Sequence, residues 1–271
     1  MVLTKYYRAQ YCRRALAAGA SLLAISAVAH AGDNEVKVTL YSGVDYSSGD
    51  YGAALDTEIF YVPVSAKATI GEWSFRVSSG YINIKGPGGV IGGGDGGVIV
   101  APDRRNMQVV EESGIGDTYF TLTYSPVFKN GDIFLDLSTK VKAPTASETK
   151  GLGTGKMDVT VKADISKFIG PVLPFASLGY RFVGQPGSFA LNDTWIASAG
   201  AAYYFSSKAS IGASYDYREA ASSLAEDSKE IFAYFDVKAT KKWGIVFYGV
   251  AGLSDGSPDF GGGVQLKMRT Y

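Results

Sequence analysis

Beyond residue 31 the chain contains neither cysteine nor histidine, because its one cysteine, Cys12, and its one histidine, His30, both lie before that point. Thiolate nucleophiles, histidine general bases and histidine metal ligands are therefore excluded from residues 32–271. Disulfide bonds are excluded as well. We therefore expect that the chain is not an enzyme, and we predict neither a cofactor nor a metal site.

Long apolar stretches and a surplus of basic charge are also absent. No apolar segment after residue 31 approaches the roughly 18 residues that a membrane-spanning helix needs. The first 31 residues hold four of the 26 Lys and Arg residues and none of the 26 Asp and Glu residues, so the rest of the chain carries a net charge of about −4. A mildly acidic chain is poorly suited to nucleic acid, and no such partner is predicted.

The first 31 residues have the layout of a secretory signal peptide. Four basic residues precede an apolar stretch at 15–29, and a small-residue site follows at Ala29-His30-Ala31. The alternative, a retained membrane anchor, is disfavoured because the apolar stretch of about 15 residues is short for a span. We predict a signal peptide at 1–31, cleaved after Ala31, and one domain at 32–271.

What is present is a long series of short segments in which polar and apolar residues alternate. The segment 158–165, for example, reads Asp-Val-Thr-Val-Lys-Ala-Asp-Ile. In a β-strand this alternation puts polar side chains on one face and apolar side chains on the other. A soluble sandwich also alternates. In a bilayer, however, every backbone group must be paired, so spanning strands occur in closed barrels, and the spacing of the whole set decides between the two.

The spacing favours a barrel. The predicted strands are 36–46, 57–70, 73–84, 115–125, 132–142, 157–169, 173–183, 193–205, 209–219, 229–240, 243–253 and 259–270. Connectors after odd-numbered strands are generally long, as at 85–114, whereas those after even-numbered strands are as short as Gly71-Glu72. Long loops on one side and short turns on the other are typical of outer-membrane proteins, whose final strand also often ends in an aromatic residue such as Tyr271.

The fold class predicted from this pattern is all-β, a transmembrane antiparallel up-and-down β-barrel of about 12 strands. The predicted localisation is the cell outer membrane of a Gram-negative bacterium. The expected partners are outer-membrane lipid, the barrel assembly machinery and a small-molecule solute.

The register directs one set of charged side chains into the lumen. The candidates for lining it are Arg76, Asp136, Lys140, Lys142, Asp158, Lys162, Asp164, Arg181, Asp216, Arg218, Asp236 and Lys238, together with Lys37, Asp45, Lys67, Asp117, Lys267 and Arg269. These charges can pair across strands and hold a wet interior together. They can also form a selective lining for a polar or anionic solute. An acid/base pair such as Asp158 with Asp164 would lack the histidine of known barrel hydrolases.

The segment 86–97 is rich in glycine. It lacks the Lys-Ser/Thr ending of a phosphate-binding loop and the repetition of a calcium-binding turn. We interpret it as the tip of a long extracellular loop. The loop can also fold inward, in which case Val90-Ile91 and Val98-Ile99-Val100 would form an apolar gate.

Three short motifs occur in the middle of the chain. They are Gly114-Ile115-Gly116-Asp117, Lys140-Val141-Lys142-Ala143-Pro144-Thr145, and Lys150-Gly151-Leu152-Gly153-Thr154-Gly155 followed by Asp158. Pro144 ends a strand ladder because it lacks an N–H, and Gly151, Gly153 and Gly155 permit a sharp turn. Physically, then, the motifs are typical of loop architecture.

The pattern resembles outer-membrane transporters of the phenol meta-pathway degradation family. In these, a glycine-aspartate strand start, here Gly116-Asp117, is followed by a Lys-x-Pro-Thr strand end, here with Pro144 and Thr145, and a Gly-Leu-Gly-Thr-Gly turn. The resemblance implies a channel or uptake protein associated with aromatic compounds. The function predicted from residues and resemblance together is a passive pore for small molecules. The alternatives are a structural or adhesive barrel with a closed lumen and, less favoured, a barrel hydrolase.

Overall fold

The structure, a computed structural model, describes residues 36–92, 98–100, 108–128, 133–187 and 189–270. The predicted signal peptide at 1–31 lies outside the described residues and stays a prediction. Within the described part of the chain, no helix has the length and apolar character needed to cross a membrane.

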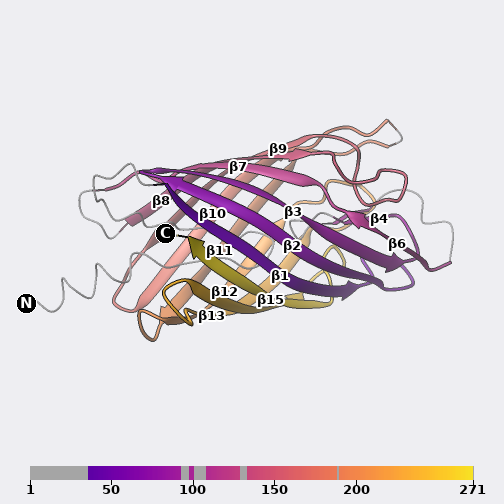
Figure 1. Cartoon of the computed structure of the whole chain (residues 1–271). Helices are drawn as coiled ribbons and strands as arrows, with labels where there is room; N and C mark the ends of the chain where they lie inside the picture. The colour runs from indigo at the N-terminus through magenta and orange to yellow at the C-terminus, as the bar shows by residue number, and fades with distance from the viewer. Residues whose placement is uncertain (1–35, 93–97, 101–107, 129–132, 188, 271) are drawn as a thin grey trace, which may run out of the picture.

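The described strands form a closed antiparallel barrel of twelve strands, as the sequence predicted. They are β1 (Lys37–Gly49), β2 (Thr57–Ile70), β3 (Trp73–Gly86), the pair β6 (Val110–Ile115) and β7 (Thr118–Tyr124), β8 (Ile133–Ala143), β9 (Asp158–Lys167), β10 (Val172–Phe182), β11 (Thr194–Tyr204), β12 (Ala209–Arg218), β13 (Ser228–Val237), β14 (Trp243–Gly252) and β15 (Phe260–Thr270). Neighbours along the chain pair with each other, and β15 pairs with β1 to close the barrel (Figure 1).

The two ends of the barrel differ in their connectors. Short turns such as Gly71-Glu72 join the strands at the end where β15 finishes, called the turn end here. Gly71 there has φ +55°, a conformation that favours glycine. Longer connectors lie at the opposite end, called the loop end, which is at the right of Figure 1. This arrangement agrees with the predicted alternation of long and short connectors.

One barrel strand is interrupted. β6 pairs with the loop-end half of β3, and β7 pairs with its turn-end half. Between them the N–H of Gly116 donates to the carbonyl oxygen of Gly80 at 2.8 Å. The predicted strand 115–125 therefore starts at Val110 instead and is broken at Gly116-Asp117. β8 pairs with β7 and ends at Ala143, where Pro144 follows without an N–H to donate.

The outward-facing side chains are large and apolar around the whole barrel. Examples with well-exposed side chains are Leu40, Val64, Phe75, Leu122, Leu137, Val161, Leu178, Ile211, Ile231, Phe247 and Leu266. An apolar surface of this extent is not stable in water and fits lipid instead.

Tryptophans mark both ends of this surface. Trp73 begins β3 at the turn end and packs on Tyr124, whereas Trp195 near the start of β11 packs on Tyr180 at the loop end. Aromatic girdles at the two interfaces are typical of outer-membrane barrels.

Candidate functional site: the lumen and its loop-end mouth

A short hairpin lies in the mouth at the loop end. It consists of β4 (Val90–Gly92) and β5 (Val98–Val100), which pair with each other and, among the described residues, with no barrel strand. A Cβ at Gly92 would lie 2.7 Å from Cδ1 of Ile82 and 2.9 Å from Cδ1 of Ile84. Those two isoleucines alternate with outward-facing residues of β3 and so point into the lumen. The hairpin therefore folds inward, which is the second of the two interpretations of segment 86–97.

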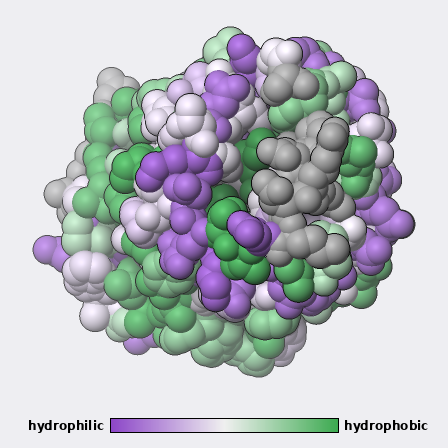
Figure 2. Space-filling model, turned by 90° about the vertical axis from the view of Figure 1, so that its right-hand side faces the viewer, coloured by the Kyte–Doolittle hydropathy of each residue, from purple (hydrophilic) through white to green (hydrophobic). Residues whose placement is uncertain are grey.

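The hairpin is buried by side chains from three other loop-end connectors. Val90 and Val100 pack with Tyr51 and Ala225, and on the other side Ile99 packs with Val183 and Leu191. Val100 is only 1% exposed. The apolar segments predicted as a gate thus form a packed layer in the mouth. Figure 2 shows a hollow at this end with apolar side chains in its interior and polar side chains along part of its border.

Tyr51 supports the hairpin from a strained backbone. Its φ is +48°, in the left-handed region that side chains other than glycine rarely adopt. Its side chain is 2% exposed, and burial raises the pKa of its hydroxyl to about 12, so the group stays neutral. A non-glycine residue held in this conformation indicates that the surrounding structure fixes the position of the ring.

Four charged side chains join the strands beneath the inner loop 144–157. Lys142 Nζ lies 2.9 Å from Asp158 Oδ2 and 3.7 Å from Asp117 Oδ2, and Arg181 binds the same oxygen of Asp158. Lys142 also donates to Thr154 Oγ1 at 3.0 Å. Asp117, Lys142 and Asp158 are nearly fully buried. This ion network, defined as Asp117, Lys142, Asp158 and Arg181, carries two charges of each sign and satisfies most of its hydrogen-bonding groups.

The motif residues quoted for the family resemblance meet at the same place. The Thr145 hydroxyl donates to the carbonyl oxygen of Gly116 at 3.1 Å, and Asp117 Oδ1 accepts from the N–H of Ala146 at 3.0 Å. A Cβ at Gly153 would lie 2.9 Å from Cβ of Ala146 and 3.0 Å from Asp117 Oδ2. Only glycine fits that approach without displacement.

The motifs therefore position a loop. Gly151 has φ +67° and Gly155 has φ +63°, and between them Leu152 turns inward and packs on Ile82 and Ile84. The loop that begins at Pro144 covers the edge of β6 that none of the described strands pairs with, and Lys150 Nζ donates to Ser113 O there at 3.1 Å. Their placement supports the structural interpretation of these residues.

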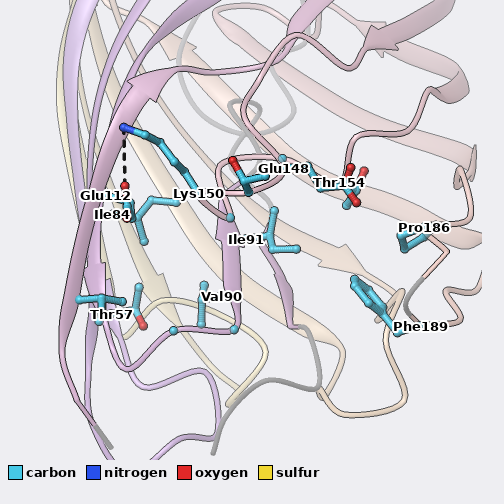
Figure 3. A pocket seen from close by; sticks show the side chains of 17 residues that line it. Thr57, Ile84, Val90, Ile91, Glu112, Glu148, Lys150, Thr154, Pro186 and Phe189 are labelled. Atoms are coloured by element: carbon cyan, nitrogen blue, oxygen red, sulfur yellow. Dashed lines mark ion pairs between the residues drawn. The ribbon is translucent and has the colours of Figure 1, made fainter. Parts of the chain in front are cut away.

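A cavity of about 500 Å³ lies between the hairpin and this loop, and it is called the vestibule here. Figure 3 shows Glu112 and Lys150 on one side, Phe189 and Pro186 on the opposite side, and Val90 and Ile91 between them. Glu112 and Lys150 are 3.6 Å apart and half exposed. The vestibule therefore has an ion pair on one side and the ring of Phe189 on the other, within a volume large enough for a small organic molecule.

Further down the lumen, the charged candidates lie on the inward-facing positions of their strands or next to them. Lys162 pairs with Asp164 at 2.9 Å, and Lys267 pairs with Asp236 at 2.6 Å. Lys140 lies over the ring of Tyr119 at 5.5 Å. These contacts show that several of the charges pair or stack within the wall.

The other candidates differ in their surroundings. Asp136 lies opposite Asp164, and Asp216 accepts a hydrogen bond from Ser214 at 3.2 Å. Arg218 is the last residue of β12, and Lys238 follows the end of β13. Asp158 forms an ion pair with Arg181, whereas Asp164 forms one with Lys162. The structure therefore does not bring the two carboxylates together as an acid/base pair.

An apolar wall also faces the lumen, and it was not singled out from the sequence. It consists of Leu173, Phe175, Ala202, Tyr204, Phe232, Tyr234 and Val246, with Phe134, Phe168, Tyr248 and Val250 packed against it. A signal was present, because Phe232 and Tyr234 share the inward phase of Asp236, and Leu173 and Phe175 share that of Arg181. In the parts of the chain that the structure describes, no group of acidic, histidine or cysteine side chains could hold a metal ion.

Comparison of the sequence with known proteins finds no match. No family model matches the chain, and no curated protein matches it in sequence. The resemblance to the phenol meta-pathway degradation family is therefore not confirmed.

Among solved structures, an outer-membrane channel from Pseudomonas putida F1 is similar over 90% of this chain and 100% of its own, with 11% identity and a TM-score of 0.63. The porin NanC is similar over 86% of this chain and 100% of its own, with 7% identity and a TM-score of 0.54. The toluene transporter TbuX of Ralstonia pickettii matches more weakly, over 88% of this chain and 90% of its own, with 10% identity and a TM-score of 0.44. At these identities the first two similarities establish the barrel fold alone.

Proposed function

We propose that this protein is an outer-membrane channel that lets small amphipathic molecules diffuse passively into the periplasm of a Gram-negative bacterium. The observation that carries the proposal is the sequence of surfaces along the lumen. A vestibule with polar and apolar sides opens at the loop end, and below it the lumen has one charged wall and one apolar wall. A solute with a ring and a polar group can remain in contact with suitable surfaces along this route.

Orientation and assembly follow from the same proposal. The loop end faces the outside, since long connectors are extracellular in barrels of this class, and the turn end faces the periplasm. We propose that the leader at 1–31 directs export, that the assembly machinery inserts the barrel, and that the protein has no enzymatic role. An aromatic preference is supported by the motif resemblance and by the aromatic residues of the apolar wall, Phe175, Phe232 and Tyr234.

A second candidate is a barrel that does not transport. It is favoured by one observation, namely that the hairpin and the loop 144–157 pack into the mouth. In that case the long loops would serve adhesion or structure.

Conductance separates the two candidates. The folded protein is placed in a planar bilayer, and the current is measured with and without added phenol. A steady current that phenol reduces supports the channel. A protein that is folded, as judged by its heat-modifiable mobility in a gel, but carries no current supports the closed barrel and contradicts the channel.

A further inference from the structure

Four basic side chains gather on one part of the lumenal wall, toward the turn end. Arg269 of β15 and Lys67 of β2 both lie opposite Thr39 of β1, and Lys67 lies directly opposite Arg76 of β3. Lys267 lies opposite Tyr41, on the next inward position toward the loop end. These residues, Lys67, Arg76, Lys267 and Arg269, are called the basic cluster here. Three of them thus form a row across four adjacent strands.

Such a row is electrostatically unfavourable unless anions are near. Like charges directly opposite each other in a sheet are destabilising. Lys67 is 6% exposed and Lys267 is 5% exposed, so water screens their charges poorly. Two carboxylates partly compensate. Asp236 binds Lys267 at 2.6 Å, and Asp136 interacts electrostatically with Lys67. The two arginines bring the cluster to a net positive charge.

Both arginines have hydrogen-bond donors to spare. Arg76 Nη2 and Arg269 Nη1 are buried and have no hydrogen-bond partner among the described residues. A buried donor without a partner costs free energy that a bound oxygen atom would recover. Charge-assisted hydrogen bonds from guanidinium to carboxylate are among the strongest in proteins.

The guanidinium of Arg76 is also held in place. Its Cζ lies 4.7 Å from the centre of the Tyr41 ring, so the ring supports one face of the guanidinium group. Stacking of this kind orients the group and leaves its N–H edges directed sideways. Arg76 is therefore arranged to receive a planar acceptor such as a carboxylate.

The basic cluster adjoins the apolar wall. The ion pair between Lys267 and Asp236 passes over β14 at Gly244, where a Cβ would lie 3.9 Å from both Cβ and Cδ of Lys267. Moving from Asp236 toward the loop end, the next inward residue of β13 is Tyr234. Its hydroxyl is buried and also has no hydrogen-bond partner in the described structure. Phe232 follows, with its ring centre 6.0 Å from that of Tyr234. Cationic donors and an aromatic surface thus occur side by side.

We propose that the basic cluster binds the carboxylate of an amphipathic organic anion while the apolar wall holds its ring or hydrocarbon part. This inference rests on the proposed function in one respect, which is that the solute reaches the lumen from outside. It deepens that function by naming the solute class as organic monocarboxylates. Aromatic and aliphatic acids share the carboxylate that the basic cluster would bind. The probes below therefore include one acid of each kind.

Binding is tested on the whole folded protein in detergent by isothermal titration with sodium benzoate, sodium hexanoate and benzyl alcohol. The main variant carries the double substitution Arg76→Gln and Arg269→Gln. A second variant, Arg76→Lys, keeps the positive charge but lacks the planar guanidinium group and its paired N–H donors. Lys85→Gln is the matched control, since it removes one positive charge from an exposed pair with Glu58 outside the cluster. We expect benzoate binding to weaken about ten-fold or more in the double variant, less in Arg76→Lys, and not in the control.

Several results decide the proposal. Benzyl alcohol, which lacks the charge, should bind more weakly than benzoate and should not respond to the arginine substitutions. Hexanoate binding equal to that of benzoate would support the carboxylate contact and assign the apolar wall a general role. Benzoate binding that is absent, or unchanged in a folded double variant, overturns the anion site.

Failure of this site and failure of the channel can be told apart. A protein that conducts but binds no benzoate would retain the proposed function and lose the anion site. A protein that binds benzoate through the two arginines but carries no current would lose the channel function and retain the site.

Discussion

The two walls of the lumen have opposite characters although they belong to the same barrel. On β15, β2 and β3, with β1 between β15 and β2, inward positions carry Lys67, Arg76, Lys267 and Arg269, whereas on β10 to β14 many inward positions carry apolar and aromatic residues. A soluble domain would be destabilised by the basic wall in its interior, because its core must be apolar to fold. In the barrel, the closed ladder of hydrogen bonds and the outer apolar surface hold the fold, so the lumen is free to vary.

The ion network and the basic cluster also differ in how completely their polar groups are paired. The ion network at the loop end is nearly saturated with partners and holds the loop 144–157. The basic cluster at the turn end leaves donors unsatisfied. The ion network supports the mouth, and the basic cluster, whose two arginines have donors without a partner among the described residues, is the one we assign to the solute.

The largest effect is expected for Asp158→Asn in the ion network. The change leaves Lys142 and Arg181 without their shared carboxylate in a buried site, which costs on the order of 3–5 kcal/mol. Urea unfolding of the barrel in lipid vesicles, followed by tryptophan fluorescence, measures the loss. The exposed pair of Glu58 and Lys85 is the control, because Glu58→Gln should cost less than about 1 kcal/mol. Equal losses in both variants would contradict the structural role of the network.

A smaller effect is expected for Phe232→Ala in the apolar wall. Phe232 is 7% exposed and contacts Tyr234 and Tyr248 with ring centres 6.0 and 5.9 Å apart. Loss of this packing should cost about 2 kcal/mol in the same unfolding assay. It should also widen the lumen and raise the single-channel conductance. Phe247→Ala, which removes an outward-facing ring, is the control and should leave the conductance unchanged.

Gly92→Val tests the hairpin. The new side chain would collide with the ends of Ile82 and Ile84, so the hairpin must move away from β3 at a cost of about 1–2 kcal/mol. We expect a larger current through the mouth in planar bilayers. Gly187→Ala is the control, because a Cβ there meets no atom within 4 Å. A current that does not change in Gly92→Val would show that the hairpin does not limit passage.

The smallest effect is expected for Lys150→Gln at the rim of the vestibule. Lys150 and Glu112 are about half exposed, so their ion pair contributes less than about 1 kcal/mol. The unfolding free energy should stay within that range of the wild type. A loss as large as that of Asp158→Asn would mean that the loop 144–157 is held at its rim instead of at the ion network.

Much of the fold was readable from the sequence because a barrel strand has a strict period of two. The strand at 158–165 shows the alternation plainly, and its predicted inward residues Asp158, Lys162 and Asp164 occupy inward positions in the structure. The split of β6 from β7 at Gly116 was not readable, since it depends on Gly80 across the sheet and on the course of the loop after Pro144.

The sequence by itself determined the strand number, the alternation of long and short connectors and the phase of the charged residues, because these follow from local periodicity. Tertiary structure alone decided three other features: that the hairpin of β4 and β5 folds inward, that Lys142 joins Asp117 to Asp158, and that a row of basic residues adjoins an aromatic wall. Each of these depends on contacts between different strands or connectors. Lys142 meets Asp117 and Asp158 when β7, β8 and β9 pair, and the basic row is complete only when β15 pairs with β1 and the barrel closes.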